Sequence, residues 1–191
     1  MYERGSFETP FGPVPIAADW TDALQAVSPY IHPHPTAHVR EHSLEMQLPF
    51  LKRVLPDAEI VPLVMGHQRR ETAYALGDAI AAASNGRKAV LVASTDLSHY
   101  QPAAEAARLD RKVIDQVERF DPDGLMSLLE SFPEHACGGG PTVAVMRAAK
   151  LLGAVHTRVL KYGDSGDVSG DKDAVVGYLA AAIGTFPGGS N

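Results

Sequence analysis

The chain has 191 residues, of which 45% are hydrophobic and 21% charged, and its formal net charge is −6 at neutral pH. These values are typical of a globular protein, and an acidic balance without a basic run argues against nucleic-acid binding. The single cysteine excludes an internal disulfide, and no apolar run has the length of a membrane span. We therefore expect one cytoplasmic domain over residues 1–191, with no membrane among its partners.

The first third of the chain combines short helices with proline-rich turns. Residues 1–15 predict an extended segment or turn with a short strand pair, and residues 18–27 predict a short helix. Residues 31–38 (IHPHPTAH) contain three histidines, a composition that suits a metal tract, but the prolines favour a solvated loop. Leucines at helical spacing in residues 41–55 predict an amphipathic helix, in which Pro49 causes a kink or starts a second part.

Glu41 and His42 stand at the entrance of this helix. Free backbone N–H groups at a helix start favour negative charge, so Glu41 suits that position. Two interpretations stay open for the pair. They form a helix cap and its neighbour, or they line a functional pocket.

Two short apolar runs, residues 60–65 (IVPLVM) and 88–93 (KAVLVA), predict buried strands. Residues 71–84 between them predict an alanine-rich helix. A strand, a helix and a second strand at this spacing form the βαβ unit of a parallel sheet. The expected fold class is therefore α/β, with a largely parallel central sheet flanked by helices.

Polar side chains follow both predicted strands, His67 after the first and residues 94–99 after the second. In open α/β sheets, ligands bind outside the carboxyl ends of the strands. Asp96 and His99 are three residues apart, and an imidazole is well matched to proton transfer near neutral pH. In the alternative interpretation, Asp96 caps the next helix and His99 is a half-buried surface group.

The second half predicts helices over residues 102–120, 121–131 and 142–152. The loop 132–140 ends in a cysteine and three glycines, a run that usually lets the backbone approach another group closely. Cys137 in this loop precedes a helix N-terminus, where a thiolate is stabilised. We expect Asp96, His99, His42 and Cys137 to converge on one cleft.

The C-terminal part predicts a half-exposed strand over residues 155–162 and a buried strand over residues 174–183. The loop between them, residues 163–173, has four aspartates. It resembles a calcium loop in composition only, because it lacks the full carboxylate register and the closing glutamate. A polar loop is favoured over a calcium site.

Residues 41–51 (EHSLEMQLPFL), 94–100 (STDLSHY) and 137–141 (CGGGP), with TPFG at residues 9–12, occur in the order seen in one family. Together they resemble the Memo family, whose bacterial and archaeal members are named AmmeMemoRadiSam system protein B. The resemblance implies a LigB-like fold, similar to the class III extradiol dioxygenases, which open catechol rings at non-haem Fe(II). It matches His99 to their acid–base histidine, and it matches Cys137 to a metal-ligand position of the Memo family.

The family pattern normally begins with a further segment that carries two more metal-ligand histidines, and this chain starts after both. The resemblance therefore implies an incomplete metal site, in which Cys137 contributes to weak binding of Fe(II) or copper. It also implies that the opening strands of the sheet are absent. An uncovered sheet edge would let the chain associate with itself.

Three functions remain open. The first is a metal-dependent redox or dioxygenase-like enzyme, in which Asp96 orients His99, His99 moves protons, and Glu41 and His42 line the pocket. The second is a non-catalytic protein that binds a small molecule or a peptide in the same cleft. The third is a cysteine-nucleophile enzyme, in which His99 or His42 activates Cys137.

Overall fold

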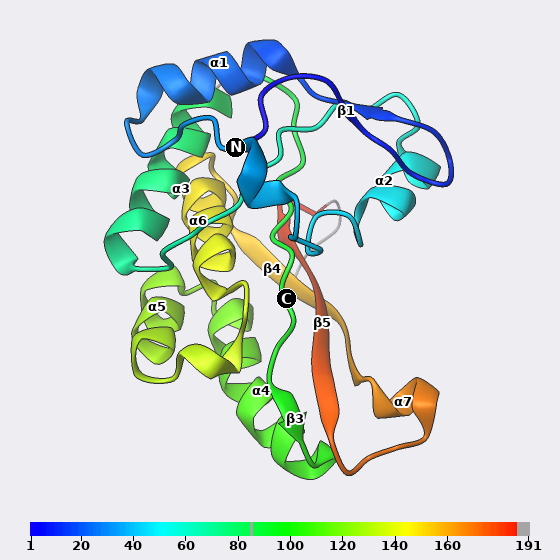
Figure 1. The fold of residues 1–191 in the computed structure, drawn as a ribbon. Helices are drawn as coiled ribbons and strands as arrows, with labels where there is room; N and C mark the ends of the chain where they lie inside the picture. The colour runs from blue at the N-terminus through cyan, green and yellow to red at the C-terminus, as the bar shows by residue number, and fades with distance from the viewer. Residues whose placement is uncertain (85, 187–191) are drawn as a thin grey trace.

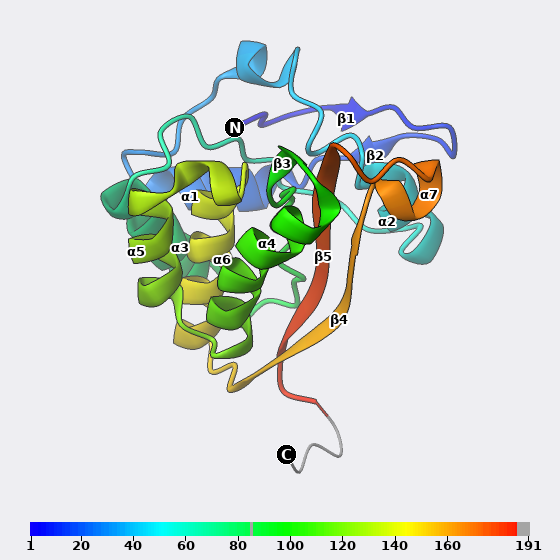
Figure 2. The same cartoon turned by 90° about the horizontal axis from the view of Figure 1, so that it is seen from below.

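The protein is described here by a computed structural model over residues 1–84 and 86–186, in which seven α-helices and five strands form a mixed α/β fold. Five helices lie on one side of the two longest strands, β4 (His156–Asp164) and β5 (Val175–Gly184), as both views show (Figures 1 and 2). These helices are α1 (Ala18–Val27), α3 (Arg70–Ser84), α4 (Ala103–Glu118), α5 (Pro122–Ser131) and α6 (Gly139–Leu151).

All strand pairs of the described residues are antiparallel. β5 lies between β4 and the short strand β3 (His99–Gln101). Near the N-terminus, β1 (Ser6–Phe7) pairs with β2 (Val14–Pro15). The strands expected over residues 155–162 and 174–183, and the short N-terminal pair, are confirmed, but β5 is not the buried strand that was predicted, since only Val175 and Gly177 are buried.

The predicted parallel βαβ unit is not formed in the described part of the chain, so the expectation of a largely parallel sheet is not met there. Helix α3 is present, but Ile60 makes only an isolated parallel bridge with Ile16, and residues 88–93 belong to no strand. A strand exists only where a neighbouring segment completes its hydrogen-bonded ladder. No backbone hydrogen bond joins residues 61–65 to residues 88–93 within the described ranges. Apolar composition alone therefore misassigned both runs.

Proline starts α2 rather than bending it. The helix α2 covers Leu48–Val54, shorter than the predicted 41–55, with Pro49 in its first turn. Proline is tolerated there because its missing N–H would have no helical partner. Of the two interpretations of Pro49, the one in which it begins the helix is correct. Residues 43–47 before it form turns.

The glycine run is part of α6, which begins at Gly139, earlier than the predicted start at residue 142. A side chain at Gly138 would collide with the carbonyl oxygen of Ser94, and one at Gly139 would collide with Leu129. At Gly140 a Cβ atom would lie 2.8 Å from Met65 Sδ. The close approach predicted from the run is confirmed, and it lets the start of α6 pack against three different segments.

The buried apolar side chains form two clusters. The larger one joins α4, α5 and α6 to the sheet and includes Leu97, Leu125 and Met146, each 2% exposed or less. The smaller one joins α1, α3 and α6 and includes Leu24 and Ile80. Because Leu97 precedes β3 and belongs to the larger cluster, the core itself fixes the backbone that carries Asp96 and His99.

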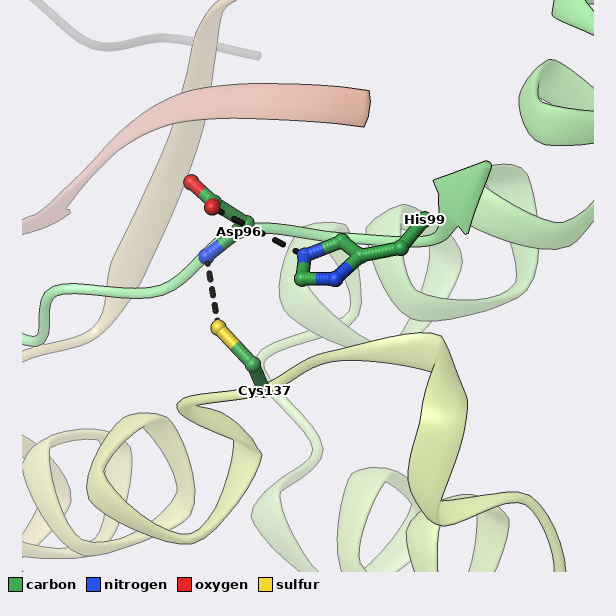
Figure 3. A group of neighbouring side chains, drawn as sticks. All are labelled: Asp96, His99 and Cys137. Atoms are coloured by element: carbon green, nitrogen blue, oxygen red, sulfur yellow. Dashed lines mark hydrogen bonds and ion pairs between the residues drawn. The ribbon is translucent and has the colours of Figure 1, made fainter. Parts of the chain in front are cut away.

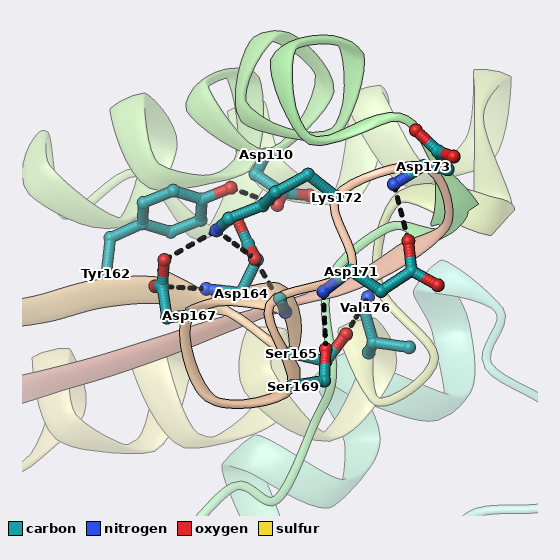
Figure 4. Close-up of polar contacts among 11 residues, drawn as sticks. Asp110, Tyr162, Asp164, Ser165, Asp167, Ser169, Asp171, Lys172, Asp173 and Val176 are labelled. Atoms are coloured by element: carbon teal, nitrogen blue, oxygen red, sulfur yellow. Dashed lines mark hydrogen bonds and ion pairs between the residues drawn. The ribbon is translucent and has the colours of Figure 1, made fainter.

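The acidic loop between β4 and β5 is closed by its own lysine. Lys172 Nζ lies 2.7 Å from Asp164 Oδ1 and 2.6 Å from Asp167 Oδ1 (Figure 4). The short helix α7 (Gly166–Ser169) follows the first of these carboxylates. The ammonium group between the two carboxylates offsets part of their mutual repulsion.

No helix of the described residues is long and apolar enough to cross a membrane.

His38 is a buried histidine in the short 3-10 helix Pro35–His38, between the edges of the Tyr2 and Phe7 rings. It is 9% exposed, and neither ring nitrogen has a hydrogen-bond partner among the described residues. Burial lowers the pKa of His38 below its ordinary value of 6.5. The unfolded chain therefore binds a proton at His38 more readily than the folded chain does.

The pH dependence of stability tests this burial. As the pH falls below about 6.5, the unfolded state gains a proton that folded His38 resists, so the free energy of unfolding decreases. We expect His38→Phe to lose less of its unfolding free energy between pH 7 and pH 5 than the wild type, by urea denaturation at each pH. His156→Phe, at an exposed histidine of β4, should follow the wild type. Equal pH slopes for wild type and His38→Phe would contradict the account.

Candidate functional site

Asp96, His99 and Cys137 lie together, although 41 residues separate the aspartate from the cysteine (Figure 3). One ligand atom of each side chain lies within 4.8 Å of the others. Asp96 Oδ2 is 3.7 Å from His99 Nε2. Asp96 lies in the segment before β3, His99 is the first residue of β3, and the loop before α6 supplies Cys137. The fold thus joins a carboxylate, an imidazole and a thiol at one point.

Reciprocal backbone contacts hold these two segments side by side. The N–H of Asp96 donates to Cys137 Sγ at 3.2 Å, and the N–H of Cys137 donates to the carbonyl oxygen of Asp96 at 3.2 Å. Thr95 Oγ1 accepts a hydrogen bond from the N–H of Gly138 at 2.8 Å. The missing side chain of Gly138 is what lets the segments come this close. The sulfur atom is therefore held beside Asp96 by its neighbours.

Leu97 and Ser98, between the aspartate and the histidine, are held by β5 and α4. The N–H of Leu97 donates to the carbonyl oxygen of Gly177 at 2.9 Å. The N–H of Gly177 donates to the carbonyl oxygen of Ser98 at 3.0 Å. The N–H of Ser98 donates to Asp110 Oδ1 at 2.8 Å. Both residues are at most 2% exposed, whereas the side chains of Asp96 and His99 are partly exposed. The buried dipeptide therefore presents its two polar neighbours at the surface.

The donor set fits a metal ion. His99 Nε2 is buried and has no hydrogen-bond partner among the described residues, so its bonding capacity is unused in this arrangement. Cys137 is exposed, which leaves the sulfur accessible. Imidazole, carboxylate and thiolate are all ligands of first-row transition metals, and the thiolate favours the softer ones.

Glu41 and His42 do not join this group. The Glu41 carboxylate accepts a hydrogen bond from the N–H of Ser43 at 2.8 Å, and this bond lowers the pKa of Glu41 below its usual value. His42 Nδ1 lies 2.7 Å from Glu45 Oε1, and the His42 side chain is 75% exposed. Glu41 thus stabilises a turn before α2 and does not cap that helix, whose N-cap is Gln47, while His42 makes a surface ion pair.

The backbone around these residues nevertheless reaches the site. Ser94 Oγ donates to the carbonyl oxygen of Ser43 at 2.8 Å, and Gln47 Nε2 donates to Ser94 Oγ at 3.0 Å. The turn before α2 therefore supports the loop that carries Asp96. Sequence reasoning placed this segment near the site but selected Glu41 and His42, whose side chains point to other partners.

A pocket of about 360 Å³ opens beside Cys137. Its lining includes His67, Gln68 and Arg69 from the segment before α3 and the glycines at the start of α6. Gln68 Oε1 accepts a hydrogen bond from the N–H of Gly140 at 2.7 Å, and Gln68 Nε2 donates to the carbonyl oxygen of Cys137 at 2.7 Å. Gln68 was missed from the sequence, because an exposed glutamine before a helix carries no signal of such a long-range cap.

The structure thus combines a mixed α/β fold with a cysteine, a histidine and an aspartate gathered near the start of α6. The family model described as "Memo-like protein" matches residues 1–182. This chain belongs to the Memo family. That resemblance was drawn from three motifs, and the match over nearly the whole chain confirms it.

Archaeal relatives show the extent of the similarity. MEMO1 family protein MTH_45 of Methanothermobacter thermautotrophicus is 38% identical over 180 residues, which are 93% of this chain and 65% of the relative. A MEMO1 family protein of Methanosarcina mazei is 39% identical over 183 residues, covering 94% and 68%. MEMO1 family protein MK0963 of Methanopyrus kandleri is 41% identical over 179 residues, covering 92% and 63%. The chain thus spans about two thirds of the length of the curated relatives it matches.

The requirement for glycine at position 138 is testable. A Cβ atom there would collide with a backbone carbonyl oxygen, which cannot rotate away as a side chain does. We expect Gly138→Ala to lower the free energy of unfolding by about 1–3 kcal/mol, the usual range for overpacking. Gly66→Ala is the matched control, because a Cβ atom at Gly66 meets open space. Urea unfolding measures both, and equal stabilities of the two variants would show that the close approach is not required.

Proposed function

We propose that this chain binds one first-row transition-metal ion, Fe(II) or copper, through Cys137, His99 and Asp96. We further propose that such a centre serves redox or dioxygenase-like chemistry in relatives of full family length. The single observation that carries the proposal is the convergence of three ligand atoms within 4.8 Å. Membership of the Memo family supports it through the motifs that hold Asp96, His99 and Cys137.

Charge and donor number support a catalytic rather than a structural ion. A thiolate and a carboxylate contribute two negative charges that balance a divalent cation, and a neutral imidazole adds none. Closed structural sites generally use four protein ligands, whereas three leave a coordination position for water or substrate. When bound, such an ion supplies Lewis-acid or redox chemistry. The thiolate favours copper, and the imidazole and carboxylate also suit Fe(II).

The chain's own residues give the centre its orientation and its access. Asp96 Oδ2 lies 3.7 Å from His99 Nε2, so the carboxylate and the imidazole can be ligands of one ion. The pocket beside Cys137 provides the space for a small molecule or the end of a peptide. In this proposal the three side chains hold the ion beside the pocket that Cys137 lines.

A second candidate function is supported by the same sulfur atom. Cys137 is exposed, lines the pocket, accepts a hydrogen bond from the N–H of Asp96 and has an imidazole nitrogen within 4.8 Å. These are features of a cysteine nucleophile activated by a histidine. A protein that binds a ligand without transforming it would use the same pocket and would need neither a metal ion nor a nucleophilic thiolate.

Metal binding is the first test. After anaerobic equilibrium dialysis against Fe(II) or Cu(I), elemental analysis should give up to about one bound ion per wild-type chain, removable by a mild chelator because few protein donors hold it. Cys137→Ser and His99→Ala should each lose most of the bound metal. His34→Ala, at an exposed histidine outside the cluster, should retain it. Equal metal content in all four proteins, or none in the wild type, would refute the metal proposal.

If no metal binds, a second measurement separates the cysteine-nucleophile function from the non-catalytic binding function. If the wild type binds no ion, the nucleophile function predicts that iodoacetamide alkylates Cys137 faster than a free cysteine, and that His99→Ala slows the reaction. Since Cys137 is the only cysteine, the labelling is unambiguous. An ordinary alkylation rate in both proteins leaves the binding function as the remaining one of the three.

We also propose that a second copy of the chain pairs with the segment 88–93. Val90 and Val92 are 75% and 51% exposed, and residues 88–93 make no backbone–backbone hydrogen bond within the described ranges. Exposed valines beside unpaired backbone groups form a template for another strand.

The self-association has a direct test. We expect light scattering of the concentrated wild type to give a mass above 20.4 kDa, and Val92→Lys to shift it toward the monomer because a charge opposes strand pairing. Val27→Lys on α1 is the matched control, since Val27 is 49% exposed. A monomeric wild type at high concentration would contradict the proposal.

A further inference from the structure

Asp110 is a buried carboxylate outside the candidate donor set. It lies on α4 and is 0% exposed. Its Oδ1 accepts a hydrogen bond from the N–H of Ser98 at 2.8 Å. Its Oδ2 accepts one from the hydroxyl of Tyr162 at 2.8 Å, and Figure 4 shows this second bond. Removing a carboxylate from water is costly unless such donors replace its hydration. A buried aspartate on an amphipathic helix therefore indicates a specific task for its two bonds.

The neighbouring strand leaves room for this carboxylate. A Cβ atom at Gly177 on β5 would collide with Asp110 Oδ2, and Gly177 does not have a positive φ. The glycine is therefore required by space and not by backbone conformation. Gly177 also exchanges hydrogen bonds with the backbone of Leu97 and Ser98. Asp110 and Gly177 thus hold the same dipeptide from a helix and from a strand.

Tyr162 fixes the orientation of the carboxylate. Burial raises the pKa of Tyr162 above its ordinary value of 10, and the adjacent Asp110 carboxylate raises it further. The phenol therefore stays protonated at neutral pH and donates its hydrogen bond permanently. With one oxygen engaged by Tyr162, the other oxygen is directed at the N–H of Ser98.

We propose that Asp110 is a positioning residue for the candidate metal centre. Through the N–H of Ser98, it holds Asp96 and His99 within reach of Cys137. The link is short, since Ser98 lies between the aspartate and the histidine, and the N–H of Asp96 donates directly to the cysteine sulfur. This inference rests on the proposed function for its first readout, and its second readout is independent of metal.

The first readout is Co(II) binding, followed by the thiolate-to-cobalt absorption band. Asp110→Ala should weaken Co(II) binding by about 10–100-fold, the usual effect of removing a group that orients metal ligands. Asp110→Asn should restore binding to within a few-fold, because its amide oxygen still accepts from Ser98. Val117→Ala, at a residue of the same helix that is 3% exposed and belongs to the core cluster, is the control for lost stability alone. It should bind Co(II) like the wild type.

The second readout is hydrogen exchange of the Asp96 amide, whose N–H donates to Cys137 Sγ. In Asp110→Ala we expect the Asp96 amide to exchange faster relative to the amides of α6, whereas Val117→Ala should change both alike. If Asp110→Ala does not fold, Tyr162→Phe replaces it with a smaller effect in the same direction. It leaves the carboxylate with one of its two hydrogen bonds.

The outcomes separate the two proposals. Failure of the wild type to bind Co(II) would count against the metal function only, and the exchange of the Asp96 amide would still decide the role of Asp110. An unchanged relative exchange rate in Asp110→Ala would overturn the positioning role. So would wild-type Co(II) affinity in this variant.

Discussion

The reciprocal contact between Asp96 and Cys137 is the interaction on which the candidate site depends. The N–H of Asp96 donates to Cys137 Sγ, and the N–H of Cys137 donates to the carbonyl oxygen of Asp96, each at 3.2 Å. It joins the segment before β3 to the start of α6, and it forms because Gly138 carries no side chain. Neighbouring parts of the fold hold the two segments in place. Leu97 anchors one segment in the core, and Gln68 caps the helix that follows the other.

Much of the helical structure was predictable from the sequence, because caps, prolines and apolar spacing act within one helix. The boundaries of α1 and α3 follow these local signals closely. The runs 60–65 and 88–93 were misassigned, because a strand is completed by a partner that composition does not reveal. The final strands were found because β4 and β5 are each other's partners. Sequence patterns thus identified the strands whose pairing partner is the next long strand along the chain.

The candidate site was predictable to the extent that its residues stand in characteristic positions. Asp96 and His99 follow an apolar run, and Cys137 precedes a helix in a glycine run, and the structure gathers these three. His42 was grouped with them because it stood at a predicted helix entrance, but its partner is Glu45, three residues later. Asp110 was missed because, on a helix with charged neighbours, an aspartate that is fully buried has the same sequence signature as one facing solvent.

The most direct measurement of the central claim, that Asp96, His99 and Cys137 form one donor set, is X-ray absorption spectroscopy of the chain loaded with one equivalent of Zn(II). The account predicts a first coordination shell with one sulfur atom at about 2.3 Å and nitrogen or oxygen atoms at about 2.0–2.2 Å. In Cys137→Ser, the sulfur scatterer should vanish while the lighter atoms remain. A wild-type shell without sulfur, composed of oxygen and nitrogen alone, would contradict the account, because it would place the ion away from Cys137.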